Sequence, residues 1–306
     1  MPEEVMFTGG ALPTFFIIGV MKSGTSSLHN YLGQHPDVQT SWPKELNFFV
    51  SDDDDPFNKG VQGRNHAWGL SWYREHFDPS IAARGESSPA YMDPGHPGVA
   101  QRMFELVPTA TLIVLTRDPF DRAVSHFHHE TSRGRETRSL EEVLTDPTST
   151  YVRMSRYHEC LQPFYERFAP GQLVRYTQED LDLRSGEVVA NIFGRLGVDP
   201  KVEIENLEFR FNTAEGRQSF LHKALKFGRG SKLRSAIAKT LPKSLRYQID
   251  LRSRAVKAST PGGASTTATE ATPMLREQFE ALVADDVAKF AQDVVDGRII
   301  EGLSAP

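Results

Sequence analysis

A short segment near the N-terminus has the residue types that bind an anion. Residues 15–18 are apolar and end at Gly19, and apolar residues return at helical spacing between residues 28 and 32. The segment between them therefore leads into a helix N-terminus, where unpaired backbone N–H groups and the helix dipole favour negative charge. We expect it to bind a phosphate group through a lysine, three hydroxyl side chains and a glycine, namely Lys22, Ser23, Gly24, Thr25 and Ser26.

The order of residues in this segment differs from that of a Walker A phosphate loop. A Walker A loop places its lysine directly after a glycine, whereas Lys22 comes before Gly24. A magnesium–nucleotide site also needs an acidic residue close to a second strand, but the strand expected at residues 111–116 is followed by Arg117. The sequence thus predicts a site that holds phosphate with cations and backbone amides and needs no metal. A metal-dependent kinase or NTPase is the main alternative.

A second anion site is predicted around Arg117, which follows a buried strand at the edge where α/β sheets bind ligands. Asp118 and Pro119 predict a helix start. Ser125 lies off the apolar stripe of that helix, roughly 9–10 Å from its start at 1.5 Å per residue. Because a guanidinium group matches phosphate oxygens in pairs, Arg117 and Ser125 are candidates to share one phosphate. The alternative is an arginine that caps a turn and a serine that faces water.

Glu45 is the candidate general base. It follows Pro43 and Lys44 and precedes Phe48 and Phe49, which we expect to hold the segment against the core. A carboxylate beside aromatic packing tends to have a raised pKa, which suits proton abstraction near neutral pH. The alternative is a surface glutamate that is paired with Lys44.

Three histidines follow Arg117 on the same predicted helix, at positions 126, 128 and 129. Their spacing is poor for shared ligation of a metal ion. We therefore expect His126, His128 and His129 to be surface or packing residues.

Composition bounds the class of protein. The chain has 306 residues with 39% hydrophobic and 25% charged residues, which is ordinary for a globular protein, and we predict one domain over residues 1–306. The net charge of −5 argues against a general nucleic-acid binder. No apolar run approaches the roughly 20 residues that cross a bilayer. Glu3 and Glu4 do not fit a secretory signal, and the single cysteine, Cys160, fits a reducing compartment, so the expected location is the cytoplasm.

Positive charge is concentrated between Lys223 and Lys257. This segment contains eleven basic residues, and Asp250 is its one acidic residue. One interpretation is a solvated amphipathic helical hairpin. The other is a surface that meets an anionic acceptor or a membrane, which would place the protein peripherally at the bilayer. A Ser/Thr/Gly-rich loop follows at residues 259–272, and both segments are expected to be insertions or a lid.

Strands that alternate with helices predict an α/β fold with a mainly parallel central sheet flanked by helices. The pattern favours one aromatic-rich helix over residues 68–78 and a strand end that turns between Gly85 and Tyr91. The remaining expected strands are 14–19, 111–116 and 172–176, and the remaining expected helices are 118–127, 187–196 and 274–295.

Four motifs in this order resemble the PAPS-dependent sulfotransferases, in particular the heparan sulfate N- and 3-O-sulfotransferase branch and its bacterial relatives. The resemblance covers residues 14–130 and weakens beyond them. It implies a P-loop-like three-layer fold. The motifs are Gly19-Val20-Met21-Lys22-Ser23-Gly24-Thr25 with His35-Pro36-Asp37-Val38, Pro43-Lys44-Glu45-Leu46-Asn47-Phe48-Phe49, Gly69-Leu70-Ser71-Trp72-Tyr73, and Arg117-Asp118-Pro119 with Ser125.

The resemblance also implies a function: transfer of a sulfuryl group from 3′-phosphoadenosine 5′-phosphosulfate (PAPS) to a hydroxyl or amine, leaving 3′-phosphoadenosine 5′-phosphate (PAP). Lys22 to Ser26 would bind the 5′-phosphosulfate, with Lys22 also catalytic, and Arg117 and Ser125 would bind the 3′-phosphate. Glu45 matches the catalytic base. The acceptor would be a carbohydrate, a glycolipid or a small molecule. Candidate acceptor contacts are Lys44, Glu86 and Tyr91.

Two departures from the family pattern bear on the site. Ser87 follows Glu86 where the heparan sulfate enzymes have a lysine, and the late Lys-Gly-Arg loop that covers their donor has no clean match here. A further alternative is a non-catalytic protein that binds a nucleotide or a sulfated glycan and uses the basic segment 223–257.

Overall fold

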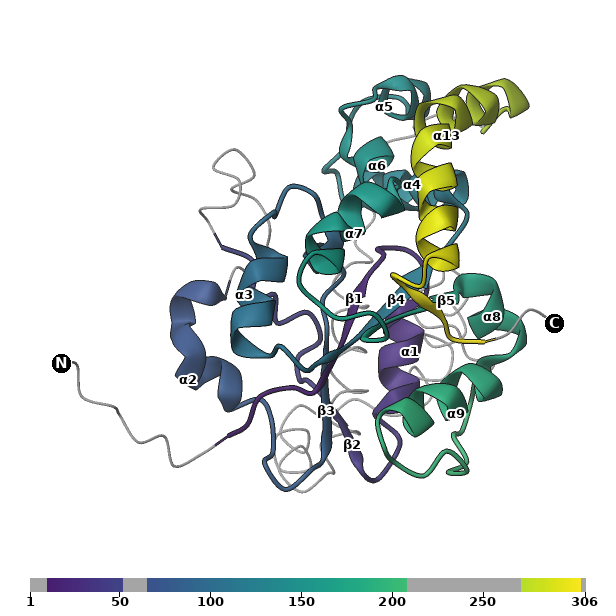
Figure 1. Cartoon of the computed structure of the whole chain (residues 1–306). Helices are drawn as coiled ribbons and strands as arrows, with labels where there is room; N and C mark the ends of the chain where they lie inside the picture. Colours follow the sequence, from purple (N-terminus) through teal and green to yellow (C-terminus); the bar gives the residue numbers. More distant parts are fainter. Residues whose placement is uncertain (1–9, 52–64, 208–270, 304–306) are drawn as a thin grey trace, which may run out of the picture.

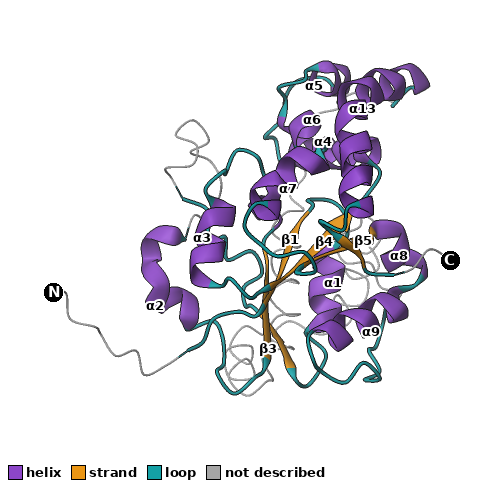
Figure 2. Ribbon diagram, viewed as in Figure 1, coloured by secondary structure: helices purple, strands orange, loops and turns teal. Residues whose placement is uncertain are grey.

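The computed structural model describes residues 10–51, 65–207 and 271–303. A six-stranded sheet lies at the centre, in the order β2-β3-β1-β4-β5-β6, and each of the five strand pairings in the described part is parallel (Figure 2). The strands are β1 (Phe15–Gly19), β2 (Val38–Thr40), β3 (Ala83–Ser87), β4 (Thr111–Thr116), β5 (Leu173–Thr177) and β6 (Ile300–Glu301).

Helices cover both faces of this sheet (Figure 1). They are α1 (Thr25–Leu32), α2 (Gly69–Arg74), α3 (Val99–Leu106), α4 (Pro119–Thr131), α5 (Leu140–Thr145), α6 (Thr150–Arg153), α7 (Tyr157–Tyr165), α8 (Gln178–Leu183), α9 (Ser185–Arg195) and α13 (Pro273–Val295). Two short 3₁₀ turns, η1 (His66–Trp68) and η2 (Pro89–Met92), precede α2 and follow β3.

The alternation of side chains along β1 explains the two layers of helices. Successive strand residues point to opposite faces, so Phe16 and Ile18 join a core with α2, α3 and α7. Phe15 and Ile17 join the other core, with α1, α8 and α9. Because both faces of β1 are covered, all five of its residues are buried. The expected three-layer α/β fold is confirmed.

Most of the elements expected from the sequence are present. The helix after β4 begins as predicted, since the Asp118 side chain accepts a hydrogen bond from the backbone N–H of Asp121 and Pro119 is the first helical residue. The expected single helix over 68–78 is wrong. Trp68 ends the 3₁₀ turn η1, Gly69 starts α2 with a φ of +80°, and α2 ends at Arg74. The aromatic side chains of Tyr73 and Phe77 are nonetheless buried as expected.

Several predictions concern residues that the structure does not describe. The basic segment 223–257 and residues 259–270 of the polar loop lie outside the described ranges. The single-domain prediction, with these segments as insertions or a lid, stays a prediction. Within residues 10–51, 65–207 and 271–303, no helix combines the length and apolarity needed to cross a membrane.

Candidate active site

The segment between β1 and α1 forms a tight loop at the carboxyl edge of the sheet. The backbone N–H of Val20 donates to the carbonyl of Leu115 at 2.7 Å, which ties the start of the loop to β4. Lys22 and Gly24 both have positive φ, at +75° and +91°. Gly24 caps α1 without a side-chain hydrogen bond, so the first N–H groups of the helix face the loop and are not used within the helix. This geometry suits the anion site that the sequence predicted, and the assignment stays a prediction.

Ser23 shows that the loop fits a phosphate. Its side chain has no exposed surface, and Oγ has no hydrogen-bond partner in the part of the chain that the structure describes. A buried hydroxyl without a partner costs free energy, and a phosphate oxygen at the helix terminus would accept its hydrogen bond. Thr25 is also buried, and Ser26 is half-buried in the first turn of α1.

Arg117 lies against this loop. It follows the last residue of β4, and its Nη1 is 3.5 Å from the carbonyl oxygen of Lys22. The hydroxyl of Tyr157, at the start of α7, donates to the carbonyl of Arg117 at 2.8 Å and fixes the backbone there. Since β1 and β4 are neighbours in the sheet, their carboxyl ends bring the Arg117 guanidinium to the backbone of the loop that carries Lys22.

One face of α4 contacts the loop between β1 and α1. Nδ1 of His129 lies 3.5 Å from Nζ of Lys22. Burial, together with the positive charge of Lys22, lowers the pKa of His129 to about 4, so the ring is neutral at pH 7 and can accept a hydrogen bond from the ammonium group. Ser125 is four residues before His129 and shares its face of the helix. Ser125 is half-buried there.

The histidines thus differ in role. His126 is buried and packs on Tyr151 with ring centroids 4.8 Å apart, and His128 is exposed. These two are the packing and surface residues that were expected, whereas the contact of His129 with Lys22 was missed. The four-residue spacing from Ser125 was the signal that could have found it.

Glu45 lies in a loop that crosses the end of β3. Its backbone N–H donates to the carbonyl of Ser87 at 3.1 Å, and its φ is +65°. The side chain points outward and is 52% exposed, and Nζ of Lys44 donates to Oε1 at 2.6 Å. The pairing with Lys44 that was considered as the alternative is therefore present.

The expected raised pKa of Glu45 is wrong. The positive charge and hydrogen bond of Lys44 lower the pKa of this carboxyl below its ordinary value, and they outweigh the opposing effect of the surrounding protein atoms. Phe48 and Phe49 are buried in the core and anchor the loop there, but the Glu45 carboxylate lies outside the core. The charge of Arg133, just after α4, and the ring of His129 when it is protonated lower the pKa further. The carboxylate is therefore within electrostatic reach of the α4 face that contacts Lys22.

Comparison with known proteins decides the family. The family model described as "Sulfotransferase family" matches residues 13–201, which include the phosphate loop, Glu45, Arg117 and Ser125. The chain belongs to the sulfotransferase family. The expected family is thereby confirmed.

Individual relatives agree with this sulfotransferase assignment. Over 122 residues, 38% of this chain, the sequence is 35% identical to the membrane-associated sulfotransferase kil1 of Dictyostelium discoideum. It is 26% identical over 208 residues, 63% of this chain, to the bifunctional heparan sulfate N-deacetylase/N-sulfotransferase 1 of Caenorhabditis elegans. The match spans 23% of the length of each of these two relatives. The solved sulfotransferase from Alicyclobacillus acidocaldarius is 29% identical, with a TM-score of 0.57, covering 70% of this chain and 92% of that one.

Glu86 and Tyr91 of this sulfotransferase do not lie where an acceptor could touch them. Their side chains are 0% and 1% exposed, and the hydroxyl of Tyr91 donates to Oε1 of Glu86 at 2.6 Å. The predicted acceptor contacts of these two residues are therefore corrected: the strand end that carries them turns into the core. Lys44 is partly buried and is bound to Glu45.

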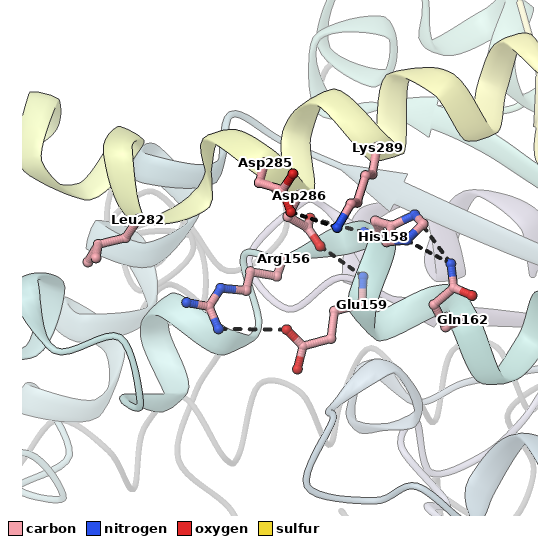
Figure 3. Close-up of a pocket in the computed structure, with 8 residues that line it drawn as sticks. All are labelled: Arg156, His158, Glu159, Gln162, Leu282, Asp285, Asp286 and Lys289. Atoms are coloured by element: carbon pink, nitrogen blue, oxygen red, sulfur yellow. Dashed lines mark hydrogen bonds and ion pairs between the residues drawn. The ribbon is translucent and has the colours of Figure 1, made fainter.

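A cavity of about 410 Å³ lies between α7 and α13, and none of the predicted site residues lines it (Figure 3). Its charges satisfy one another, since Lys289 pairs with Asp285 at 2.7 Å. The Asp286 carboxylate accepts the backbone N–H groups of His158 and Glu159, at 3.1 and 2.9 Å. We interpret this cavity as part of the contact that fastens α13 to the start of α7. Among the described residues, no group of three or more potential ligands could hold a metal ion.

Proposed function

We propose that this sulfotransferase moves a sulfuryl group from PAPS to a hydroxyl or amine of a carbohydrate, glycolipid or small-molecule acceptor. The observation that carries the proposal is the meeting of Arg117 with the phosphate loop at the carbonyl of Lys22. Two cationic groups on adjacent strands suit a nucleotide with phosphate at both its 5′ and 3′ positions. The heparan sulfate activity named for the Caenorhabditis elegans relative supports a carbohydrate as the first acceptor class to test.

Each residue has a separate part in this reaction. PAPS, when bound, supplies the activated sulfuryl group. Ser23, the loop amides and Lys22 bind the 5′ end, and the ammonium group of Lys22 neutralises charge that develops on the departing phosphate oxygen. Arg117 and Ser125 bind the 3′-phosphate. Glu45, ionised at neutral pH, removes the acceptor proton.

The test is transfer of ³⁵S from labelled PAPS to a panel of desulfated heparan chains, glycolipids and small hydroxyl and amine compounds. We expect at least one labelled product, formed equally well with EDTA. Transfer of ³²P from ATP that requires Mg²⁺, in place of sulfuryl transfer, would favour the kinase alternative. Tight binding of PAP without turnover on any acceptor would favour the non-catalytic alternative.

Arg117→Ala should weaken binding of PAP by about 10- to 10²-fold, the worth of a charge-assisted hydrogen bond of roughly 1.5–3 kcal/mol. Binding of adenosine 5′-phosphate, which lacks the 3′-phosphate, should not change. Isothermal titration calorimetry measures both affinities. Arg195→Ala, at an exposed position on α9, is the matched control and should change neither. An equal loss for the two nucleotides would refute the assignment of Arg117 to the 3′-phosphate.

Lys44→Met should move the acid limb of the pH profile of kcat/KM to higher pH. A base works when it is ionised, so activity is present above the pKa of Glu45 and is lost as the pH falls through it. Lys44 is the largest cause that lowers this pKa, so its removal raises the pKa and activity is lost sooner on acidification. The readout is the pH at which kcat/KM falls to half its plateau value, and it does not depend on the value of the plateau itself. Lys289→Met, in the α7–α13 contact, should leave the limb in place. If the limb of Lys44→Met also stays, Glu45 is not the titrating base.

A further inference from the structure

Glu86 is a fully buried carboxylate that the proposed reaction does not use. It is the fourth residue of β3 and has no exposed surface. Burying a charge is costly unless hydrogen bonds replace the lost water, so each of its contacts needs an explanation.

Four donors surround the two oxygens of Glu86. Oε2 accepts from the hydroxyl of Tyr73 at 2.5 Å. Oε1 accepts from the hydroxyls of Ser88 and Tyr91, at 2.5 and 2.6 Å, and from the backbone N–H of Asn47 at 3.2 Å. Burial raises the pKa of this carboxyl, and the four hydrogen bonds oppose that rise. Since an ionised carboxylate only accepts hydrogen bonds, the four donors offset part of the cost of burying it. The two oxygens therefore contact different parts of the fold. Oε2 contacts α2 through Tyr73, and Oε1 contacts the loop that carries Glu45 through the backbone of Asn47.

The Glu45 loop needs such support because its backbone is unusual. Glu45 and Asn47 have φ values of +65° and +49°, in the left-handed region that residues with a Cβ seldom occupy. Such conformations persist only where the surroundings fix them. Here Ser87 O accepts from the Glu45 N–H, while Glu86 Oε1 and Ser88 Oγ accept from the Asn47 N–H, the latter at 3.1 Å. Three consecutive residues at the end of β3 thus hold both left-handed residues.

The same strand is in register with the strand that leads to the phosphate loop. In the parallel pairing of β1 and β3, Phe16 lies opposite Glu86 and Ile17 opposite Ser87. The Ser88 N–H continues the ladder by donating to the carbonyl of Ile17 at 3.2 Å. Glu86 is hydrogen-bonded to Asn47, which is two residues after Glu45 in the chain. On the other side of the pairing, β1 ends at Gly19, two residues after Ile17, and the phosphate loop follows. The sheet therefore provides a rigid frame between the candidate base and Lys22.

We propose that Glu86 is a positioning residue, whose Oε1 holds the left-handed Asn47 and thereby aims the Glu45 carboxylate at the acceptor. This inference rests on the proposed function, since it assigns Glu86 a part in the work of Glu45. A residue that served only the core would contribute to stability through either oxygen. If Glu86 positions Glu45, loss of the hydrogen bonds at Oε1 should lower kcat, whereas loss of the hydrogen bond at Oε2 should not.

The test compares Glu86→Gln with Tyr73→Phe. Tyr73→Phe removes the hydrogen bond to Oε2 but keeps the ring, which stacks on Phe48 at 4.1 Å, so both variants lose a buried hydrogen bond of the same cluster. Glu86→Gln should lower kcat by about 10- to 10²-fold, the usual effect of a reacting group displaced by about 1 Å. Its affinity for PAP should not change. Tyr73→Phe should lose thermal stability and keep its kcat.

Hydrogen exchange gives a readout that needs no acceptor. The amides of residues 45–50 should exchange faster in Glu86→Gln than in Tyr73→Phe. Glu86→Gln removes the charge and one of the two acceptor oxygens, so Ser88→Ala is added as the variant specific for the Oε1 side. The Ser88 hydroxyl contacts both Oε1 and the Asn47 N–H, and a loss of kcat without loss of PAP affinity is expected in Ser88→Ala as well. Equal kcat and equal exchange in Ser88→Ala and Tyr73→Phe would overturn the inference.

A double-mutant cycle separates this inference from the base assignment. In the Glu45→Gln background, Glu86→Gln should cause no further loss of kcat, because it acts through Glu45. Additive losses would overturn the inference. A normal kcat in Glu45→Gln alone would overturn the base assignment and the positioning role with it. A loss in Glu45→Gln without a loss in either folded Glu86→Gln or Ser88→Ala would overturn the positioning role alone.

Discussion

Replacing Glu45 with Gln should lower kcat by about 10²- to 10⁴-fold, the usual contribution of a positioned general base. Gln has nearly the same size and can still accept the hydrogen bond from Lys44, so the loop should keep its conformation. What it loses is the ability to take a proton. The Glu45 carboxylate is ionised at neutral pH, and Lys44 lowers its pKa further below the ordinary value. It is also half exposed, and hence open to an acceptor.

The measurement is kcat for the best acceptor of the ³⁵S panel, together with the PAP affinity and the melting temperature. Affinity and melting temperature should match those of the wild type, because the Glu45 side chain adds little to the core. Glu105→Gln, at an exposed position on α3, is the matched control and should have normal turnover. Wild-type kcat in purified Glu45→Gln would remove Glu45 from the role of base.

Lys22→Ala should lower kcat by about 10²- to 10³-fold, comparable to the loss of one preorganised donor to a developing oxyanion. The ammonium group lies at the phosphate loop beside neutral His129, which positions it without sharing its charge. Stability should change little. Alanine at a φ of +75° has the same backbone strain as lysine, because both carry a Cβ.

Lys22→Met provides the matched variant, since it keeps the aliphatic stem and removes only the charge. It should lose as much kcat as Lys22→Ala and melt at the wild-type temperature. Lys201→Ala, on the exposed turn after α9, controls for a general effect of removing a lysine. If Lys22→Ala transferred sulfuryl groups at the wild-type rate but melted earlier, Lys22 would be a structural residue of the loop.

The phosphate loop is the part of the site that local sequence determines. A strand, an irregular segment and a helix in immediate succession leave the loop amides at the helix N-terminus. Apolar residues 15–18 and the helical spacing after Gly24 were sufficient to predict this arrangement. The start of α4 was predicted for the same reason, because the Asp118 cap and Pro119 act within one turn.

The protonation state of Glu45 and the places of Glu86 and His129 were decided by tertiary structure. Phe48 and Phe49 are buried as the sequence indicated. However, a left-handed backbone at Glu45 turns the carboxylate out of the core toward Lys44, and the expected pKa shift changed sign. No local pattern encodes this, because the hydrogen bonds that fix the loop come from β3, some 40 residues away along the chain.

Glu86 shows most clearly which contacts could not be predicted from the sequence. The family resemblance implied that Glu86 contacts the acceptor, whereas its hydrogen-bond partners come from α2, η2 and the Glu45 loop. The sequence by itself determined the order of strands and helices, the phosphate loop and the residue types that could bind a doubly phosphorylated nucleotide. Only the tertiary structure decided which of these side chains meet, because the parallel register of β1, β3 and β4 brings together residues that lie far apart in the chain.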